Sequence, residues 1–133
     1  MMRAEPVKVE AEFDRIFDRA MRSQPQIQHI LLASEQGLVV ASKATVRGKE
    51  NRLAALSPVL DDAGETMFGE VGLSPLAEVF LIGGEGCAYQ TRLKSAPVFL
   101  LISAKGQVNI GLLRMIAGQI EAQASEILRS LML

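Results

Sequence analysis

The most informative hydrophobic pattern lies in residues 27–43, where two apolar runs flank a short polar turn that ends in Gly37. Such a pattern predicts an antiparallel hairpin with strands over residues 27–34 and 38–42. In the first run Leu31 and Ala33 share one face with Ile27 and His29, while the opposite face is also largely apolar. A strand that is apolar on both faces is usually covered on both. We therefore expect helices above and below the sheet.

Three other segments carry apolar residues at helical spacing. They cover residues 6–22, residues 51–71 and a final segment that Asn109 can cap. Pro58 interrupts the second segment, so it either kinks one helix that begins near Asn51 or starts a helix with Ser57 as its N-cap. The first alternative is favoured because the apolar stripe continues through the proline, and Gly72 can serve as the C-cap.

The remaining residues predict three more strands, over residues 76–83, 87–93 and 96–103. Short turns between successive strands require antiparallel neighbours. The element order is then α-β-β-α-β-β-β-α, with one five-stranded antiparallel sheet between helical layers. The fold class predicted is a three-layer α/β (α+β) sandwich. Residues 1–133 fit a single domain by length.

The predicted strand over residues 76–83 is apolar on both faces and carries Glu78 as its only charged residue. If it lies at an edge of the sheet, it offers an unpaired backbone to another chain. An interior position is the alternative. The preceding segment has a surplus of apolar residues, including Met67 and Phe68, which favours an edge strand and a homodimer.

Composition excludes several classes of function. The net charge of −1 and the small number of aromatic residues, with no Trp, argue against nucleic-acid binding. No apolar run approaches the length of roughly 18 residues that a membrane span needs, and no signal-peptide pattern opens the chain. The single cysteine, Cys87, fits a reducing compartment. We expect a cytoplasmic protein without membrane insertion.

Candidate chemistry is sparse. His29 is the only histidine and sits among apolar neighbours, which favours a structural role. Cys87 lacks a second histidine and a nucleophile elbow. The turn over residues 83–86 lacks the lysine and helix of a phosphate-binding loop, so a hairpin turn explains it better. We predict no catalytic residue and no cofactor.

Two charged clusters remain. Asp61, Asp62 and Glu65 form an acidic cluster for which a solvated helix face is favoured over a cation site, and no metal site is predicted. A basic cluster surrounds the connection before the second helix and consists of Lys43, Arg47, Lys49 and Arg52. A solvated loop is the simpler interpretation of the basic cluster. The alternative is a docking edge for an acidic partner, in which one arginine could act on a bound GTPase.

The element order, the hairpin over residues 30–42 and the segment that opens the last helix, Asn109-Ile-Gly-Leu-Leu-Arg-Met115, together resemble the roadblock (dynein light chain) superfamily, in particular its bacterial MglB-like branch. The resemblance covers about residues 6–131. It implies the strand order 2-1-5-4-3, with the first and last helices on one face of the sheet and the second helix on the other. It also implies homodimers in which third strands pair across a two-fold axis, with the second helices adjacent.

The resemblance further implies two sets of functional residues. The predicted dimer interface comprises Leu60, Met67, Leu76, Glu78, Val79, Phe80 and Leu81. The helical face around the dimer axis is the expected docking platform, with Asp61, Asp62, Gly64, Glu65 and Phe68 as candidates.

The favoured hypothesis is a non-catalytic dimeric regulatory or scaffold protein that binds a small Ras-like GTPase. Whether it modulates GTP hydrolysis or nucleotide state stays open at this point. One alternative is a small-molecule-sensing α/β sandwich, which needs a sizeable pocket. The weakest alternative is a small enzyme that uses Cys87 or His29.

Overall fold

The computed structural model describes residues 6–132, so residues 1–5 and 133 of the predicted domain lie outside the described part. The predicted element order is confirmed. In chain order the elements are α1 (Pro6–Ser23), β1 (Ile27–Ser34), β2 (Val39–Ala44), α2 (Glu50–Glu70), β3 (Glu78–Ile82), β4 (Gly86–Arg92), β5 (Val98–Lys105) and α3 (Ile110–Met132).

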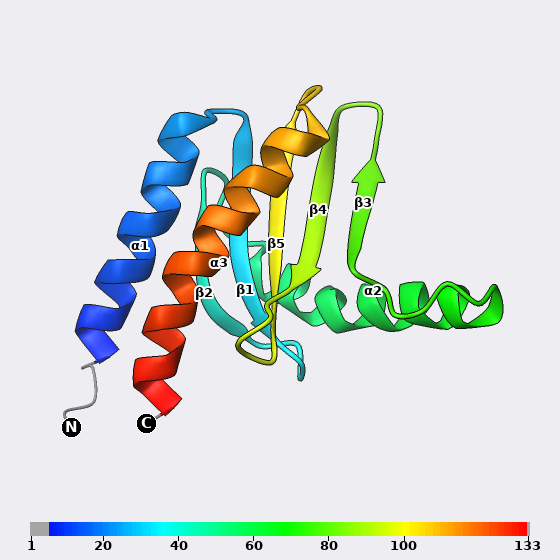
Figure 1. Ribbon diagram of the computed structural model, residues 1–133. Coiled ribbons are helices and arrows are strands. Elements are labelled where there is room, and N and C mark those ends of the chain that lie inside the picture. The colour runs from blue at the N-terminus through cyan, green and yellow to red at the C-terminus, as the bar shows by residue number, and fades with distance from the viewer. Residues whose placement is uncertain (1–5, 133) are drawn as a thin grey trace.

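The five strands form one sheet in the order β2-β1-β5-β4-β3, and every neighbouring pair is antiparallel. Helices α1 and α3 lie side by side on one face, while α2 crosses the lower end of the strands on the other (Figure 1). The predicted three-layer sandwich and strand order are therefore confirmed. The hairpins β1–β2 and β3–β4 place β2 and β3 at the two edges.

The main core lies between the sheet and the α1–α3 layer. Phe13 and Phe17 from α1 meet the buried side chains of β1 and β5, because the helical spacing predicted over residues 6–22 turns them onto one face. Asn109 caps α3 as predicted, since its Oδ1 accepts hydrogen bonds from the amides of Gly111 at 2.8 Å and Leu112 at 3.3 Å. This layer closes one face of the sheet.

The opposite face has a much smaller core, which consists of Leu31, Ala33, Ala54 and Leu101. Of the whole of α2, only Ala54 and Ser57 are buried. The helix contacts the sheet near its first half and then extends past β3 (Figure 1). The α2 face of the sheet is therefore incompletely covered within one protomer.

Two details of the hairpin differ from the predicted pattern. Ile27 belongs to the main core rather than to the face of Leu31, because the pairing of β1 with β5 shifts between Ile27 and His29. The second strand begins at Val39 and lies at the edge, where Val40 is 41% exposed. Ala41 packs against the main core and Val39 against the smaller one, so this strand is partly covered on both faces.

Helix α2 runs continuously through Pro58, so the alternative of a start at Pro58 with Ser57 as N-cap is wrong, and the favoured single helix that begins near Asn51 is confirmed. Pro58 has no backbone N–H to donate to the preceding turn. Its neighbour Ser57 ties this turn down: the Ser57 hydroxyl donates to the Leu53 carbonyl at 3.2 Å, and the Ser57 carbonyl accepts from Gln90 Nε2 at 2.9 Å. The sheet thus holds the helix at its weak point.

The end of α2 follows the Schellman pattern. Gly72 adopts a φ of 73°, Leu73 N–H donates to the Phe68 carbonyl at 2.8 Å, and Gly72 N–H donates to the Gly69 carbonyl at 3.4 Å. Gly72 therefore ends the helix as predicted. The following strand begins at Glu78 rather than Leu76, because Leu76 and Ala77 form the connection from the helix.

The turn between β3 and β4 provides a test of packing. A Cβ atom at Gly86 would overlap the Ala104 carbonyl oxygen on β5, whereas a Cβ atom at Gly84 would meet nothing within 4 Å. We expect Gly86→Ala to lower the free energy of unfolding by about 1–3 kcal/mol, as overpacking does. Urea unfolding should show a change of less than about 0.5 kcal/mol for Gly84→Ala, as for a neutral surface substitution. Equal losses in both variants would contradict this account.

Candidate self-association and partner surface

An apolar groove of about 400 Å³ lies between α2 and the sheet. Leu53, Leu56 and Leu60 form the helical wall, and Leu81 of β3 and Leu101 of β5 contribute to the floor. The apolar side of the helix faces the apolar side of the sheet. One helix is too narrow to cover five strands, so part of this apolar surface stays open as a groove. The groove continues the small second core out to the surface of the protomer.

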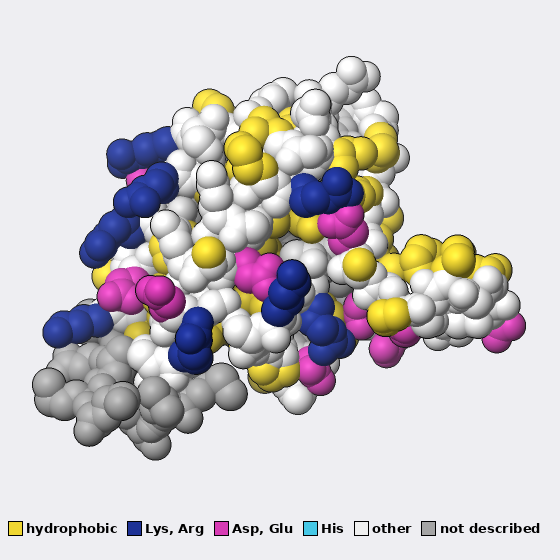
Figure 2. Space-filling view, viewed as in Figure 1, with side chains coloured by type: hydrophobic (Ala, Val, Ile, Leu, Met, Phe, Trp, Pro, Cys, Tyr) yellow, Lys and Arg dark blue, Asp and Glu magenta, His cyan; other side chains and the backbone are white. Residues whose placement is uncertain are grey.

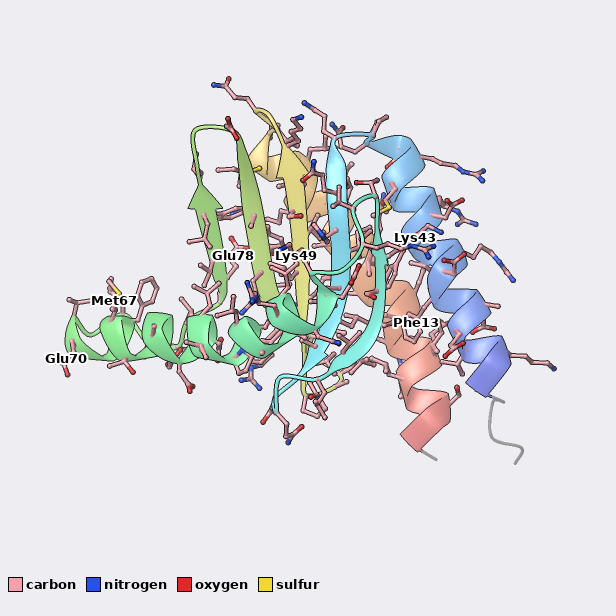
Figure 3. The ribbon with its side chains drawn as sticks, turned by 180° about the vertical axis from the view of Figure 1, so that it is seen from behind. Phe13, Lys43, Lys49, Met67, Glu70 and Glu78 are labelled. Carbon is pink, nitrogen blue, oxygen red and sulfur yellow. The ribbon has the colours of Figure 1, made fainter. Side chains whose placement is uncertain are left out.

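The end of α2 and the turn after it present exposed apolar side chains beyond the sheet. Met67, Val71 and Leu73 are 68%, 65% and 63% exposed. Met67 lies on the part of α2 that extends past β3 (Figure 3), and hydrophobic side chains line the upper side of this projection (Figure 2). We call residues 64–73 the α2 overhang. An apolar stripe exposed at this length marks an interaction surface.

The outer edge of β3 continues the same surface. Leu81 and Ile82 are 50% and 75% exposed, and the pairing of β3 with β4 is regular from Glu78 to Ile82. A regular, apolar edge strand is a template for another strand. The prediction that this strand lies at an edge of the sheet is confirmed.

The other edge of the sheet is protected. The pairing of β2 with β1 shifts between Leu32 and Ala33, which is the irregularity of a β-bulge. Lys43 of β2 also forms an ion pair with Asp14 of α1 at 2.8 Å (Figure 3). A bulge and a charged residue are common devices against strand pairing at an edge. Of the two edges, β3 is the one that can accept a second strand.

Glu78, the only charged residue of β3, is held by neighbours on the α3 face. The hydroxyl of Tyr89 donates to Glu78 Oε2 at 2.7 Å, and Arg114 Nε donates to the same oxygen at 3.2 Å. The Arg114 guanidinium also lies over the ring of Phe80, 5.5 Å from its centre. These contacts neutralise the one charge that would oppose strand pairing at this edge.

The same contacts shift two pKa values. The hydrogen bond from Arg114 is the main reason that the pKa of Glu78 lies below its ordinary value, with a further contribution from Tyr89. Burial, followed by the hydrogen bond to Glu78, raises the pKa of Tyr89 to about 12. Tyr89 therefore stays protonated and keeps donating to Glu78 at neutral pH.

Three of the five predicted docking residues make contacts within the protomer. Arg92 of β4 joins Asp61 at 3.2 Å to Glu35 at 2.8 Å. Glu65 Oε2 accepts a hydrogen bond from the Leu76 amide at 2.6 Å. Gly64 lies under Leu76, whose side chain would collide with a Cβ atom there. These residues fix the connection between α2 and the sheet.

The other two predicted docking residues are more available. Asp62 is exposed, and Phe68 is half-buried near the end of α2. Neither makes a side-chain hydrogen bond or ion pair among residues 6–132, so both stay predictions for a partner surface.

Five of the seven predicted interface residues are half-buried in the protomer: Leu60, Leu76, Glu78, Val79 and Phe80. Phe80 stacks on Tyr89 with ring centres 4.6 Å apart, so it also serves the main core. Sequence reasoning missed the exposure of Ile82 on β3 and of Leu56 and Val59 on α2. The only signal in the sequence for this exposure was the apolar stripe of the helix over residues 51–71, which is longer than the sheet is wide.

His29 and Cys87 lie on opposite faces of the sheet. His29 Nδ1 is 2.8 Å from Ser103 Oγ on the α2 side, and Cys87 packs against the main core on the α3 side. They do not form a common site. Within residues 6–132, no group of three His, Cys, Asp or Glu side chains is arranged to hold a metal ion.

The predicted basic cluster is divided in the structure. Lys43 is engaged by Asp14 and, at 3.7 Å, by Asp18. Arg47, Lys49 and Arg52 are exposed and make no ion pair among the described residues. They remain free for a partner, but they do not line the groove.

Several solved structures share this fold. MglB of Myxococcus xanthus superposes with a TM-score of 0.74 at 20% identity, over 96% of this chain and 99% of that one. An MglB with a tetrameric arrangement gives 0.78 at 15% identity, covering 90% and 89%. A Roadblock/LC7 domain from Streptomyces avermitilis gives 0.72 at 16% identity, covering 90% and 98%. The chain has the Roadblock/LC7 fold.

This likeness concerns the roadblock fold alone, because the sequences have diverged widely. No protein-family model matches the sequence, and no curated protein matches it. Between residues 6 and 132 there is no helix with the length and apolar character to cross a membrane.

The Glu78–Arg114 pair predicts a pH dependence. Because the folded-state pKa of Glu78 lies below 4.5, the pair stabilises the protein above about pH 4.5, and its contribution is lost as the pH falls through the folded-state pKa. We expect Glu78→Gln to cost up to about 1 kcal/mol at pH 7, the range for a solvent-exposed pair. Urea unfolding at a fixed protein concentration should show the variant and the parent converging toward pH 3.

Glu10→Gln on α1 is the matched control, because Glu10 is exposed and makes no ion pair among the described residues. A loss for Glu78→Gln that persists unchanged at pH 3 would contradict the assigned role of the carboxylate.

Proposed function

We propose that this chain is a non-enzymatic regulator that forms a homodimer and, as a dimer, binds a small Ras-like GTPase. The observation that carries the proposal is the combination of the open β3 edge with the α2 overhang on the same side of the protomer. The strand edge and the apolar helix would each be covered by another surface, and a second copy of this chain can cover both.

The geometry favours a symmetric dimer. Pairing two β3 strands antiparallel about a two-fold axis extends the five-stranded sheet into one of ten strands. The overhang of each protomer then extends across the partner's half of the sheet. Its exposed Met67 and Val71 are suited to the partner's groove, whose floor includes Leu81 and Leu101. Because the dimer has two-fold symmetry, the same side chains fill the groove of each protomer.

Dimerisation would place two α2 helices next to each other and make a broad helical platform. Asp62 is exposed on this helix and Phe68 is half-buried near its end, so they are the docking residues that the internal contacts leave available. The GTPase itself is inferred from the resemblance to the roadblock superfamily, whose members bind small Ras-like GTPases. A cytoplasmic location belongs to the same proposal and agrees with the single, unpaired Cys87.

A small-molecule sensor is the second candidate, because the apolar groove of about 400 Å³ could take a ligand. The dimer explains more of the structure. It accounts for the groove, the overhang and the regular β3 edge together, whereas a ligand in the groove would leave the edge and the overhang exposed.

Self-association is tested by charges placed on exposed apolar residues. We expect the double variant Met67→Glu/Ile82→Glu to be monomeric in size-exclusion chromatography with light scattering, because it buries four carboxylates in the proposed interface. Both side chains are more than two-thirds exposed in the protomer, so folding should be retained. Val40→Glu on the protected β2 edge is the control and should stay dimeric. A dimeric double variant would disprove this interface.

GTPase binding is tested in a pull-down with a candidate small Ras-like GTPase, loaded with GTP or GDP. We expect the parent dimer to bind one nucleotide state in preference, and Asp62→Lys to weaken binding by about tenfold, as for a charge reversal at an interface rim. Glu10→Lys on α1 should bind like the parent. Absence of binding in both nucleotide states would count against the GTPase, while light scattering reports separately on the dimer.

A further inference from the structure

Three arginines lie in a row along α1, on the face that points away from the sheet. Arg15, Arg19 and Arg22 are exposed and stand at spacings of four and three residues, which puts them on one side of the helix. Lys and Arg side chains gather along this helix at the left of the molecule (Figure 2). We call these three residues the arginine stripe.

Most of the charge of the stripe is uncompensated. Arg22 is paired with Asp18 at 2.8 Å, and Asp18 also lies 3.7 Å from Lys43. Arg15 and Arg19 make neither an ion pair nor a side-chain hydrogen bond with any described residue. An exposed guanidinium is a planar donor of five N–H bonds, and carboxylates match it in two-pronged geometry. The stripe is therefore suited to an acidic ligand.

A groove runs beside the stripe, between α1 and α3. It has a volume of about 400 Å³ and is lined by Ile16, Arg19, Ala20, Ser23, Gln119, Ile120 and Gln123. Its floor is apolar, since Ile120 is buried and Ile16 packs on the main core. One rim carries arginine, and the other carries two exposed glutamine amides one turn apart. None of these lining residues is acidic.

A groove between two antiparallel helices accepts a third helix, whose apolar face lies between them. An acidic helix fits this one, because glutamates at positions i, i+4 and i+7 repeat the spacing of the stripe along the axis. A bilayer fits less well, since no large apolar side chain is exposed on α1 over residues 8–23. The neighbouring hollow is lined by Glu12 and Glu126 as well as by Arg15 and Arg19. The acidic ligand is therefore placed over the α1–α3 groove, where Arg19 is the lining arginine and no lining residue is acidic.

We propose that the α1–α3 groove and the arginine stripe bind an acidic amphipathic helix of another protein. The site lies on the opposite face of the sheet from α2, so it is independent of the proposed dimer and of GTPase binding. It gives the protomer a second partner surface that self-association leaves open.

The test uses the full chain and a fluorescently labelled helical peptide with glutamates at i, i+4 and i+7 beside a leucine stripe. Fluorescence anisotropy should show tighter binding than for a peptide with glutamine at the same three positions. We expect Arg15→Glu/Arg19→Glu to weaken binding of the acidic peptide by about tenfold or more, since two exposed ion pairs are lost and reversed. Raising the salt concentration should weaken binding by the parent.

Arg47→Glu/Arg52→Glu is the matched control, because it makes the same change of charge in the basic cluster and should bind within about twofold of the parent, as distant surface charges do. Thermal unfolding and light scattering of all variants establish that fold and dimer are retained, and Arg15→Gln/Arg19→Gln replaces the reversal if it does not fold. Equal binding of both peptides, an equal effect of the control, or no binding of the acidic peptide would overturn the proposal. Binding to phosphatidylserine vesicles, lost in Arg15→Glu/Arg19→Glu while the peptide fails to bind, would assign the stripe to a membrane instead.

Discussion

The structure depends on a mismatch between the sheet and the helices available to cover it. The central strands are apolar on both faces, so both faces must be shielded from water. Two long helices close one face around Phe17 and Ile120, but a single helix serves the other, where only Ala54 and Ser57 are buried on its side. The exposed groove and the α2 overhang both follow from this deficit, and the open β3 edge lies beside them.

Local patterns were enough to predict the framework. Period-two alternation located the strands and helical spacing located the helices, while short turns required antiparallel pairing. The excess of apolar residues around β3 favoured an edge position but left an interior one open. The strand order came from family resemblance, because residue patterns alone do not distinguish which strands become neighbours.

Contacts between distant residues could not be predicted. Asp61 and Glu65 look like a solvated acidic patch in the sequence, yet Arg92 and the Leu76 amide engage them in the fold. The irregularity that moves Ile27 into the main core breaks the alternation that the prediction relied on. The exposure of the apolar side chains of α2 could not be predicted either. Periodicity shows which side of the helix is apolar, but not where the sheet beneath it ends.

The contact between Gln90 and Ser57 divides α2 into two parts with different energetics. Before Pro58 the helix is held by the sheet through a buried amide. Beyond it the last three turns rely on their own backbone bonds, on the ion pair of Asp61 with Arg92 and on the contacts with Leu76. Helical segments of that length are marginal in water when nothing packs against them. Ordering of this segment is therefore thermodynamically coupled to whatever covers it. The measured affinity for the partner that covers this segment therefore includes the free energy of ordering the helix. Substitutions that change only the helix propensity of the segment will change the binding affinity, even where the substituted side chain makes no contact with the partner.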